Sequence, residues 1–326
     1  MNRRDFMKTT GTLAAVTAFG TASVSRFAFA EEEKTWKTKL YKALISGAPN
    51  EKTLKTWKAA GIQGTETTDW SAGEEKAAQA RIMAEKLDMK IHSVMRGWTN
   101  FNQPENLEKD IESVKLALRS AKAYGADTIL LVPCRIGGMK MPEPWEFKID
   151  FDPDTLMISK VAEGDNAPYQ KYIEAHNNAT KITLETMDKL KATAEELGVV
   201  IALENVWNNL WVHPGISAAL VRKCDSPWIR FYLDLGNHVR YAPTTEWVKA
   251  FREGEIAKMH VKGFKLNPNG QGGNWCNSRE ASIDWPAVRQ AIEDINYSGW
   301  LTIEESGTPE WHNGTLDMII AGKSKP

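Results

Sequence analysis

The chain has 326 residues, of which 42% are hydrophobic, 25% charged and 9% aromatic. This composition is typical of a globular domain and excludes a disordered, a collagen-like or a disulfide-stapled chain. Lysine and arginine number 41 against 42 acidic residues, and without the first thirty residues the net charge is −4. Because binding along nucleic-acid phosphates needs a basic surface, a nucleic-acid partner is disfavoured.

Residues 1–30 have the pattern of an export signal. Arg3 and Arg4 begin it, a weakly apolar run covers residues 11–24, and Ala28-Phe29-Ala30 precedes three glutamates. The pattern resembles a twin-arginine signal, which implies export of the folded protein by the Tat machinery to the periplasm and cleavage after about Ala30. A stable membrane insertion is not expected, because no run approaches about 18 consecutive apolar residues.

Residues 31–326 are expected to form one domain without a disulfide framework, with a single cysteine pair as the alternative in an oxidising compartment. Cys134, Cys224 and Cys276 are odd in number and irregularly spaced. Such spacing predicts neither a disulfide framework nor a cysteine-based zinc site. We expect these thiols to be buried and structural.

Short β-rich runs alternate with longer amphipathic segments from residue 39 onward. Several runs, such as residues 128–132 and 199–203, are almost continuously apolar, as in strands buried on both faces. The expected strands cover residues 40–45, 64–67, 90–95, 128–132, 199–204, 229–234, 257–262 and 300–304.

Helical patterns separate these strands, with apolar residues at three-to-four spacing. Gly61, Gly125 and Gly198 lie where left-handed helix ends are expected. The expected helices cover residues 51–60, 73–87, 105–124, 169–197, 216–224, 245–252, 285–295 and 316–321. Eight strands, each followed by a helix, predict a single-domain α/β fold, the (β/α)8 TIM barrel. An open doubly wound sheet is the alternative, but no glycine-rich nucleotide loop follows the first strand.

Four successive strands end in a residue that can bind a metal. Glu204, Asp234, His260 and Glu304 are separated by 30, 26 and 44 residues, each about one strand–helix unit. Since the chemistry of such barrels lies at the carboxyl ends of the strands, these side chains should converge. Any one acid can instead cap a helix or pair with a lysine or arginine. Four together favour a divalent cation, with Mn²⁺, Co²⁺, Mg²⁺, Fe²⁺ and Zn²⁺ as candidates.

The segments that carry these residues resemble the sugar phosphate isomerase/epimerase family of xylose-isomerase-like TIM barrels. The matching segments are residues 126–133, 203–208, 231–237 and 260–262, within a resemblance that spans residues 38–306. The resemblance implies one divalent metal held by Glu204, Asp234, His260 and Glu304, and Mn²⁺ is the ion that we expect. The resemblance also implies that the two glutamates exchange protons with the substrate in epimerases. Gly263 stands where many members have aspartate, which leaves the substrate open.

Isomerisation and epimerisation of sugars both begin with removal of a proton α to a carbonyl. A metal ion stabilises the resulting enediolate, and a carboxylate within about 3 Å accepts the proton. We therefore expect Glu204 and Glu304 to be catalytic. Lys262 is a further catalytic candidate, able to neutralise an enolate oxygen, although a surface lysine is an equal alternative.

Further residues near the strand ends are candidate substrate contacts. His238 and Asn237 follow the sixth strand, and Glu66 ends the second; a loop histidine bonded to water is an alternative for His238. Trp98 and Trp207 can stack on sugar C–H faces, as can Trp145 and Trp275. Residues 134–166 and 267–278 are expected to form lids over the site.

Three functions remain open from the sequence. Export and the lack of an arginine cluster favour an unphosphorylated sugar or keto-sugar as the substrate of an isomerase or epimerase. The same apparatus suits a 3-keto-glycoside lyase or hydratase acting by β-elimination, and a non-catalytic sugar-binding barrel is the third reading. A DNA-repair enzyme would need more histidine ligands and a basic groove. A monomer and a homo-oligomer are both open.

Overall fold

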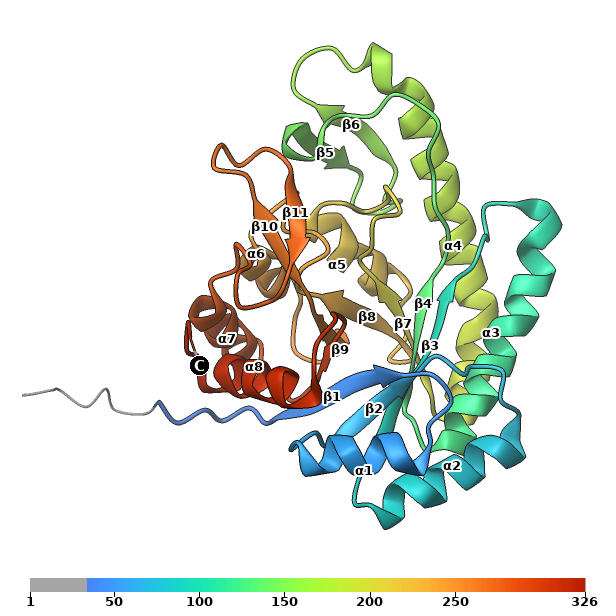
Figure 1. Cartoon of the computed structure of the whole chain (residues 1–326). Coiled ribbons are helices and arrows are strands. Elements are labelled where there is room, and N and C mark those ends of the chain that lie inside the picture. Colours follow the sequence, from blue (N-terminus) through green and yellow to red (C-terminus); the bar gives the residue numbers. More distant parts are fainter. Residues whose placement is uncertain (1–33, 326) are drawn as a thin grey trace, which may run out of the picture. The chain divides into compact units, whose positions relative to one another are not determined.

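In a computed structural model, which describes residues 34–325, the unit from Trp36 onward contains a closed barrel of eight parallel strands (Figure 1). The order around the barrel is β1-β12-β9-β8-β7-β4-β3-β2. The strands are β1 Leu40–Ser46, β2 Gly64–Thr67, β3 Lys90–Trp98, β4 Thr128–Val132, β7 Val200–Glu204, β8 Ile229–Asp234, β9 Ile256–Val261 and β12 Gly299–Ile303. The predicted barrel is confirmed. The predicted signal, residues 1–30, lies outside the described residues.

Each barrel strand is followed by a helix within the described range, as predicted. Gly125 and Gly198 end α3 and α4 in left-handed conformation, with φ of 73° and 68°. The helices are α1 Glu51–Ala59, α2 Glu74–Lys86, α3 Pro104–Tyr124, α4 Gln170–Leu197, α5 Pro214–Lys223, α6 Thr244–Ala250, α7 Trp285–Asp294 and α8 Pro309–Ala321. Of the described helices, none has the length and apolar character needed to cross a membrane.

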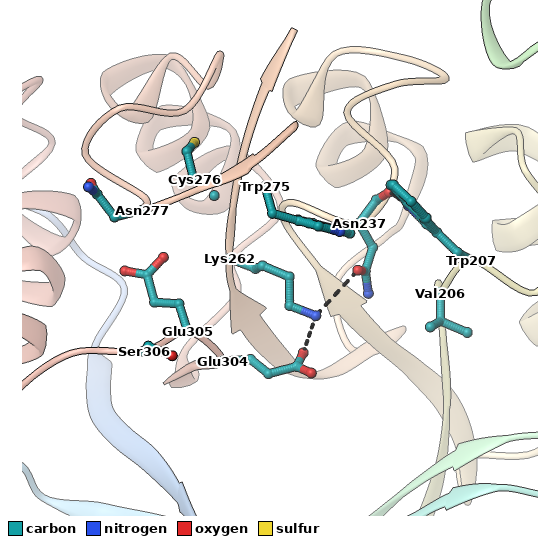
Figure 2. A pocket seen from close by; sticks show the side chains of 11 residues that line it. Val206, Trp207, Asn237, Lys262, Trp275, Cys276, Asn277, Glu304, Glu305 and Ser306 are labelled. Carbon is teal, nitrogen blue, oxygen red and sulfur yellow. Dashed lines mark hydrogen bonds and ion pairs between the residues drawn. The ribbon is translucent and has the colours of Figure 1, made fainter. Parts of the chain in front are cut away.

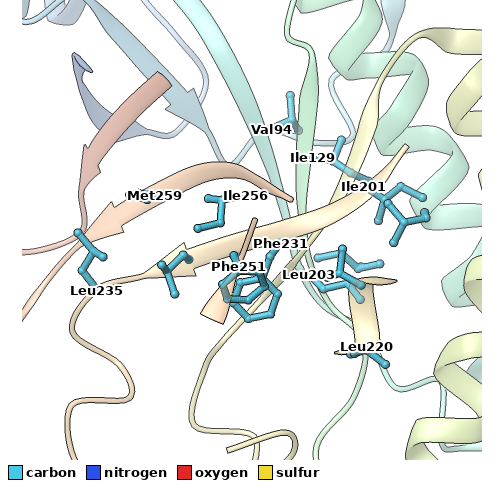
Figure 3. Packing of buried hydrophobic residues seen from close by; sticks show 14 of the residues in the cluster. Val94, Ile129, Ile201, Leu203, Leu220, Phe231, Leu235, Phe251, Ile256 and Met259 are labelled. Carbon is cyan, nitrogen blue, oxygen red and sulfur yellow. The ribbon is translucent and has the colours of Figure 1, made fainter. Parts of the chain in front are cut away.

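Successive side chains along the strands belong to two separate apolar clusters, one between the strands and the helices and one inside the barrel. Residues such as Ile201, Leu203 and Phe231 belong to the large cluster that includes helix residues, where Phe231 stacks on Phe251 with 4.5 Å between ring centroids (Figure 3). The residues between them form a separate small cluster inside the barrel: Leu130, Val132, Val200, Ala202 and Tyr232. Because successive side chains of a strand point to opposite faces, even-numbered positions of β7 and β8 face the lumen.

Two antiparallel hairpins interrupt the strand–helix alternation. β5 Phe147–Phe151 pairs with β6 Ile158–Ala162 between β4 and α4. β10 Gly263–Leu266 pairs with β11 Gly273–Cys276 between β9 and α7. Both hairpins follow the carboxyl end of a barrel strand, where the chemistry of the fold is located. The segments expected to be lid loops therefore contain paired strands, whose backbone hydrogen bonds hold them in shape.

Candidate metal centre and substrate cavity

Four side chains from neighbouring strands meet at the carboxyl end of the barrel. Glu204 ends β7, Asp234 ends β8, His260 lies in β9, and Glu304 directly follows β12. One ligand atom from each lies within 4.8 Å of the others. Glu204, Asp234 and His260 are buried, and Glu304 is partly exposed. The side-chain alternation of the strands turns all four toward the lumen, since Leu203, Leu233, Met259 and Ile303 pack outward.

The donor set fits a divalent cation. Nδ1 of His260 lies 3.4 Å from Oε1 of Glu204 and 3.3 Å from Oε2 of Glu304. Within the described part of the chain, this nitrogen and Oδ2 of Asp234 have no hydrogen-bond partner although they are buried. Ligands that each bind an ion at about 2.0–2.2 Å lie up to roughly 4.4 Å apart, close to the observed spacing. The group can therefore bind a metal ion.

The charges at the centre favour an added cation. Burial raises the pKa of Glu204, and the charges of Glu304 and Asp234 raise it further, although His260 opposes them. Burial also raises the pKa of Asp234, against the effect of Lys262. Burial alone would lower the pKa of His260, but the carboxylates of Glu66, Glu204 and Glu304 outweigh it and hold this pKa well above its usual value. The centre thus attracts positive charge.

Asp234 is oriented by the backbone that follows it. Its Oδ1 accepts hydrogen bonds from the amides of Gly236 and Asn237 at 2.7 and 2.6 Å. The side chain of Asn205 bonds both to the amide and to the carbonyl of Asp234. With Oδ1 occupied in this way, Oδ2 is the oxygen left to face a cation.

A cavity of about 560 Å³ opens beside Glu304 (Figure 2). Lys262 Nζ lies in it, 2.8 Å from Oε2 of Glu304 and 3.4 Å from Oδ1 of Asn237. Trp207 and Trp275 pack together with ring centroids 4.7 Å apart, and Lys262 Nζ is 5.3 Å from the Trp275 ring. The lining residues are Val206, Trp207, Asn237, Lys262, Gly263, Trp275, Cys276, Asn277, Glu304, Glu305 and Ser306.

The family model described as "Xylose isomerase-like TIM barrel" matches residues 54–320 of the chain. The chain belongs to the xylose isomerase-like TIM barrel family. Comparison with curated proteins gives no match.

Solved structures share the barrel of this family. A D-tagatose 3-epimerase-like protein is 14% identical, with a TM-score of 0.64 over 86% of this chain and 97% of its own. Mannonate dehydratase from Streptococcus suis is 15% identical, with a TM-score of 0.62 over 89% and 98%. The 3-keto-D-glucoside 4-epimerase from E. coli is 13% identical, with a TM-score of 0.60 over 87% and 99%. At these identities the likeness shows the fold.

In this xylose isomerase-like barrel, two predicted substrate contacts lie outside the cavity lining. His238 is buried, its Nε2 is 2.9 Å from the carbonyl oxygen of Val206, and its ring packs against Trp247. Burial lowers the pKa of His238 to about 3. Nε2 of His238 is therefore placed to bond to the backbone. Trp98 is 41% exposed and carries the guanidinium of Arg135 on its ring, 4.1 Å from the centroid.

Glu66 is also absent from the residues that line the cavity. It is 0% exposed, and its Oε2 is 2.5 Å from Nε2 of His260. The structure shows a contact with a metal-ligand candidate, and the expected contact with substrate stays a prediction. An acid in the middle of an otherwise uncharged strand signals a buried partner, but the sequence does not say which one.

Several lining residues are not among the predicted substrate contacts. Trp275 is predicted only as one of several stacking tryptophans, Cys276 and Asn277 only as part of the lid of residues 267–278, and Glu305 and Ser306 have no predicted role. Trp275, Cys276 and Asn277 reach the cavity because β11 folds back onto β10, directly after Lys262. The signal that could have located them is the Asn-Pro-Asn-Gly turn of residues 267–270, which is typical of a hairpin.

Proposed function

We propose that the protein is a divalent-metal-dependent sugar isomerase or epimerase that removes a proton α to the carbonyl of an unphosphorylated sugar or keto-sugar. The observation that carries this proposal is the buried Glu204–Asp234–His260–Glu304 group beside a tryptophan-walled cavity. A divalent cation bound there supplies Lewis-acid stabilisation of the negative charge that forms on the substrate oxygens. Mn²⁺ is the ion that we favour.

The residues around the group take distinct roles in this proposal. Glu204 and Glu304 come from β7 and from the end of β12, so their carboxylates face a bound sugar from different sides and accept or return the carbon-bound proton. Lys262 Nζ lies 2.8 Å from Glu304 and is placed to donate a hydrogen bond to a substrate oxygen. Trp207 and Trp275 offer apolar walls that exclude water and contact C–H groups.

The substrate class follows from the charges of the cavity. Among the described lining residues, Lys262 is the only cation, and it is already paired with Glu304. A phosphoryl group is normally held by several charge-assisted hydrogen bonds, often from arginine. Export through the Tat pathway, which we propose for residues 1–30, would also remove the enzyme from cytoplasmic sugar phosphates. Both considerations favour an unphosphorylated substrate.

A 3-keto-glycoside lyase or hydratase is the second candidate. The cavity of about 560 Å³ that Glu304 lines is also lined by Cys276, Asn277 and Ser306, and we propose that it accommodates a sugar together with its leaving group. In that reaction a carboxylate takes the proton from carbon 2, the electrons form the carbon 1–carbon 2 double bond, and the anomeric C–O bond breaks. The departing alkoxide is protonated to release the alcohol.

The test uses the purified, Mn²⁺-loaded protein in deuterated water. Ketohexoses and 3-keto-glucosides are incubated separately and followed by NMR for deuterium uptake and by chromatography for a freed aglycone. Uptake without aglycone supports the isomerase or epimerase, and aglycone release supports the lyase. If the protein binds both metal and sugar but catalyses no deuterium exchange, the result supports the non-catalytic sugar-binding barrel.

Variants assign the proton transfer. Glu204→Gln should retain measurable metal binding but lose exchange, because the amide cannot accept the proton. Glu310→Gln, an exposed position on α8, makes the same chemical change away from the site and should behave as wild type. A Glu204→Gln variant with wild-type exchange would overturn the assignment of Glu204.

A further inference from the structure

A fully buried carboxylate crosses the barrel lumen to reach the histidine of the metal centre. Glu66 lies on β2 and His260 on β9, and β1 and β12 separate these strands in the barrel. Both side chains are 0% exposed, and Oε2 of Glu66 lies 2.5 Å from Nε2 of His260. The contact is therefore formed across the lumen and not along the sheet.

This contact determines which nitrogen of the ring is free. An ionised carboxylate only accepts hydrogen bonds, so Nε2 of His260 must carry the hydrogen that Glu66 receives. In the neutral ring the lone pair is then on Nδ1. That is the nitrogen that lies 3.4 Å from Glu204 and 3.3 Å from Glu304 and that has no hydrogen-bond partner among residues 34–325.

Glu66 is itself held in place by the neighbouring strand. The hydroxyl of Ser93 on β3 donates to Oε1 of Glu66 at 2.9 Å, so each carboxylate oxygen has a partner. The β2–β3 register shifts between Thr65 and Glu66: Thr65 lies opposite Ile91, and Glu66 lies opposite Ser93. Without this irregularity the residue opposite Glu66 would be His92. A register irregularity in a barrel strand redirects a side chain, and here it brings the hydroxyl to the carboxylate.

We propose that Glu66, supported by Ser93, is a positioning residue that sets the tautomer and the rotation of His260 for metal binding. The ring of Tyr232, 4.5 Å from that of His260, restricts its tilt further. The inference rests on the proposed metal site but concerns residues outside the ligand set. Partners of this kind commonly contribute about 10–100-fold to metal affinity, because they orient the imidazole and increase its basicity.

The test is the dissociation constant for Mn²⁺, measured by calorimetry on the full folded protein. Glu66→Leu removes the acceptor and should weaken binding by about 10–100-fold. Glu66→Gln keeps an oxygen that can accept from Nε2 but loses the charge, so its loss should be smaller. Ser93→Ala leaves the pair intact and should weaken binding the least. Binding by Glu66→Leu within twofold of wild type would overturn the proposal.

Two further measurements separate this inference from its alternatives. Long-range ¹H–¹⁵N NMR of the Zn²⁺-loaded protein should show His260 protonated on Nε2 and metal-bound through Nδ1, and the opposite pattern would refute the role of Glu66. If circular dichroism shows that the Glu66→Leu variant does not fold, the Mn²⁺ dissociation constants of Glu66→Gln and Ser93→Ala test the proposal instead. Wild-type affinity in both of these variants would refute it. Failure of the wild-type protein to bind any divalent ion would instead refute the proposed function.

Discussion

A methyl group added at Gly263 should change the wall of the cavity and leave the metal centre unchanged. Gly263 begins β10 and lies opposite Cys276 of β11. A Cβ atom built on Gly263 would lie 2.5 Å from the carbonyl carbon and oxygen of Asn277 and 2.6 Å from the carbonyl oxygen of Cys276. These atoms belong to the backbone, so the end of β11 must move by about 0.9 Å to reach an ordinary contact of 3.4 Å.

The expected effect of Gly263→Ala follows from what β11 carries. Overpacking of this kind costs about 1–3 kcal/mol, part of which the hairpin relieves by moving. Trp275 and Asn277 would move with β11, whereas the metal-ligand candidates lie on β7, β8, β9 and the end of β12. We therefore expect kcat/KM to fall at least tenfold, which corresponds to about 1.4 kcal/mol, with the Mn²⁺ dissociation constant unchanged.

The assay compares Gly263→Ala with a matched glycine variant. Gly47→Ala adds the same methyl group where no atom lies within 4 Å, and should match wild type. Thermal unfolding measures the stability, calorimetry the metal affinity, and steady-state kinetics the efficiency. Because Trp275 is 46% exposed, a changed tryptophan emission would report movement of the hairpin. Gly263→Ala with wild-type stability and kcat/KM would show that the hairpin does not constrain the cavity as argued.

Three other predictions concern the metal, the lysine and a buried histidine. Chelation of the metal should abolish turnover and lower the unfolding temperature, and added Mn²⁺ should restore both. A ligand present at 100 times its dissociation constant stabilises the folded protein by about 2.7 kcal/mol. An unfolding temperature that chelation does not change would contradict the metal site. The Lys262→Met variant should bind Mn²⁺ at least as tightly as the wild type, because the substitution removes a cation 2.8 Å from Glu304. Its kcat should fall roughly 100-fold. Weaker Mn²⁺ binding by this variant would contradict a role of Lys262 in catalysis alone. His176 accepts a hydrogen bond from the Trp211 amide, and burial lowers its pKa from 6.5 to about 3. The unfolded chain thus binds the proton first, so His176 alone should lower the stability by about 2 kcal/mol between pH 7 and pH 5. Urea unfolding of His176→Gln should show a drop that is smaller by about this amount.

The sequence by itself determined the barrel and the four candidate ligands. Apolar runs alternate with amphipathic helical patterns eight times, which is a local property of the chain. Alternation along each strand then decides which side chains face the lumen. Glu204 and Asp234 end strands in which the preceding leucine packs outward, so both acids face inward once the strands are parallel neighbours. Their convergence needs only this periodicity and the usual strand order of the fold.

Other features depend on contacts that only the closed barrel creates. Glu66 and His260 are 194 residues apart and meet across the lumen, so neither the spacing nor the strand order predicts their pairing. His238 has the residue type of a substrate contact, yet packing against Trp247 buries it away from the cavity. Trp275 reaches the cavity only because β11 returns over Gly263. Periodicity along one strand is encoded locally, whereas contacts between distant strands are decided by barrel closure, register irregularities and side-chain packing.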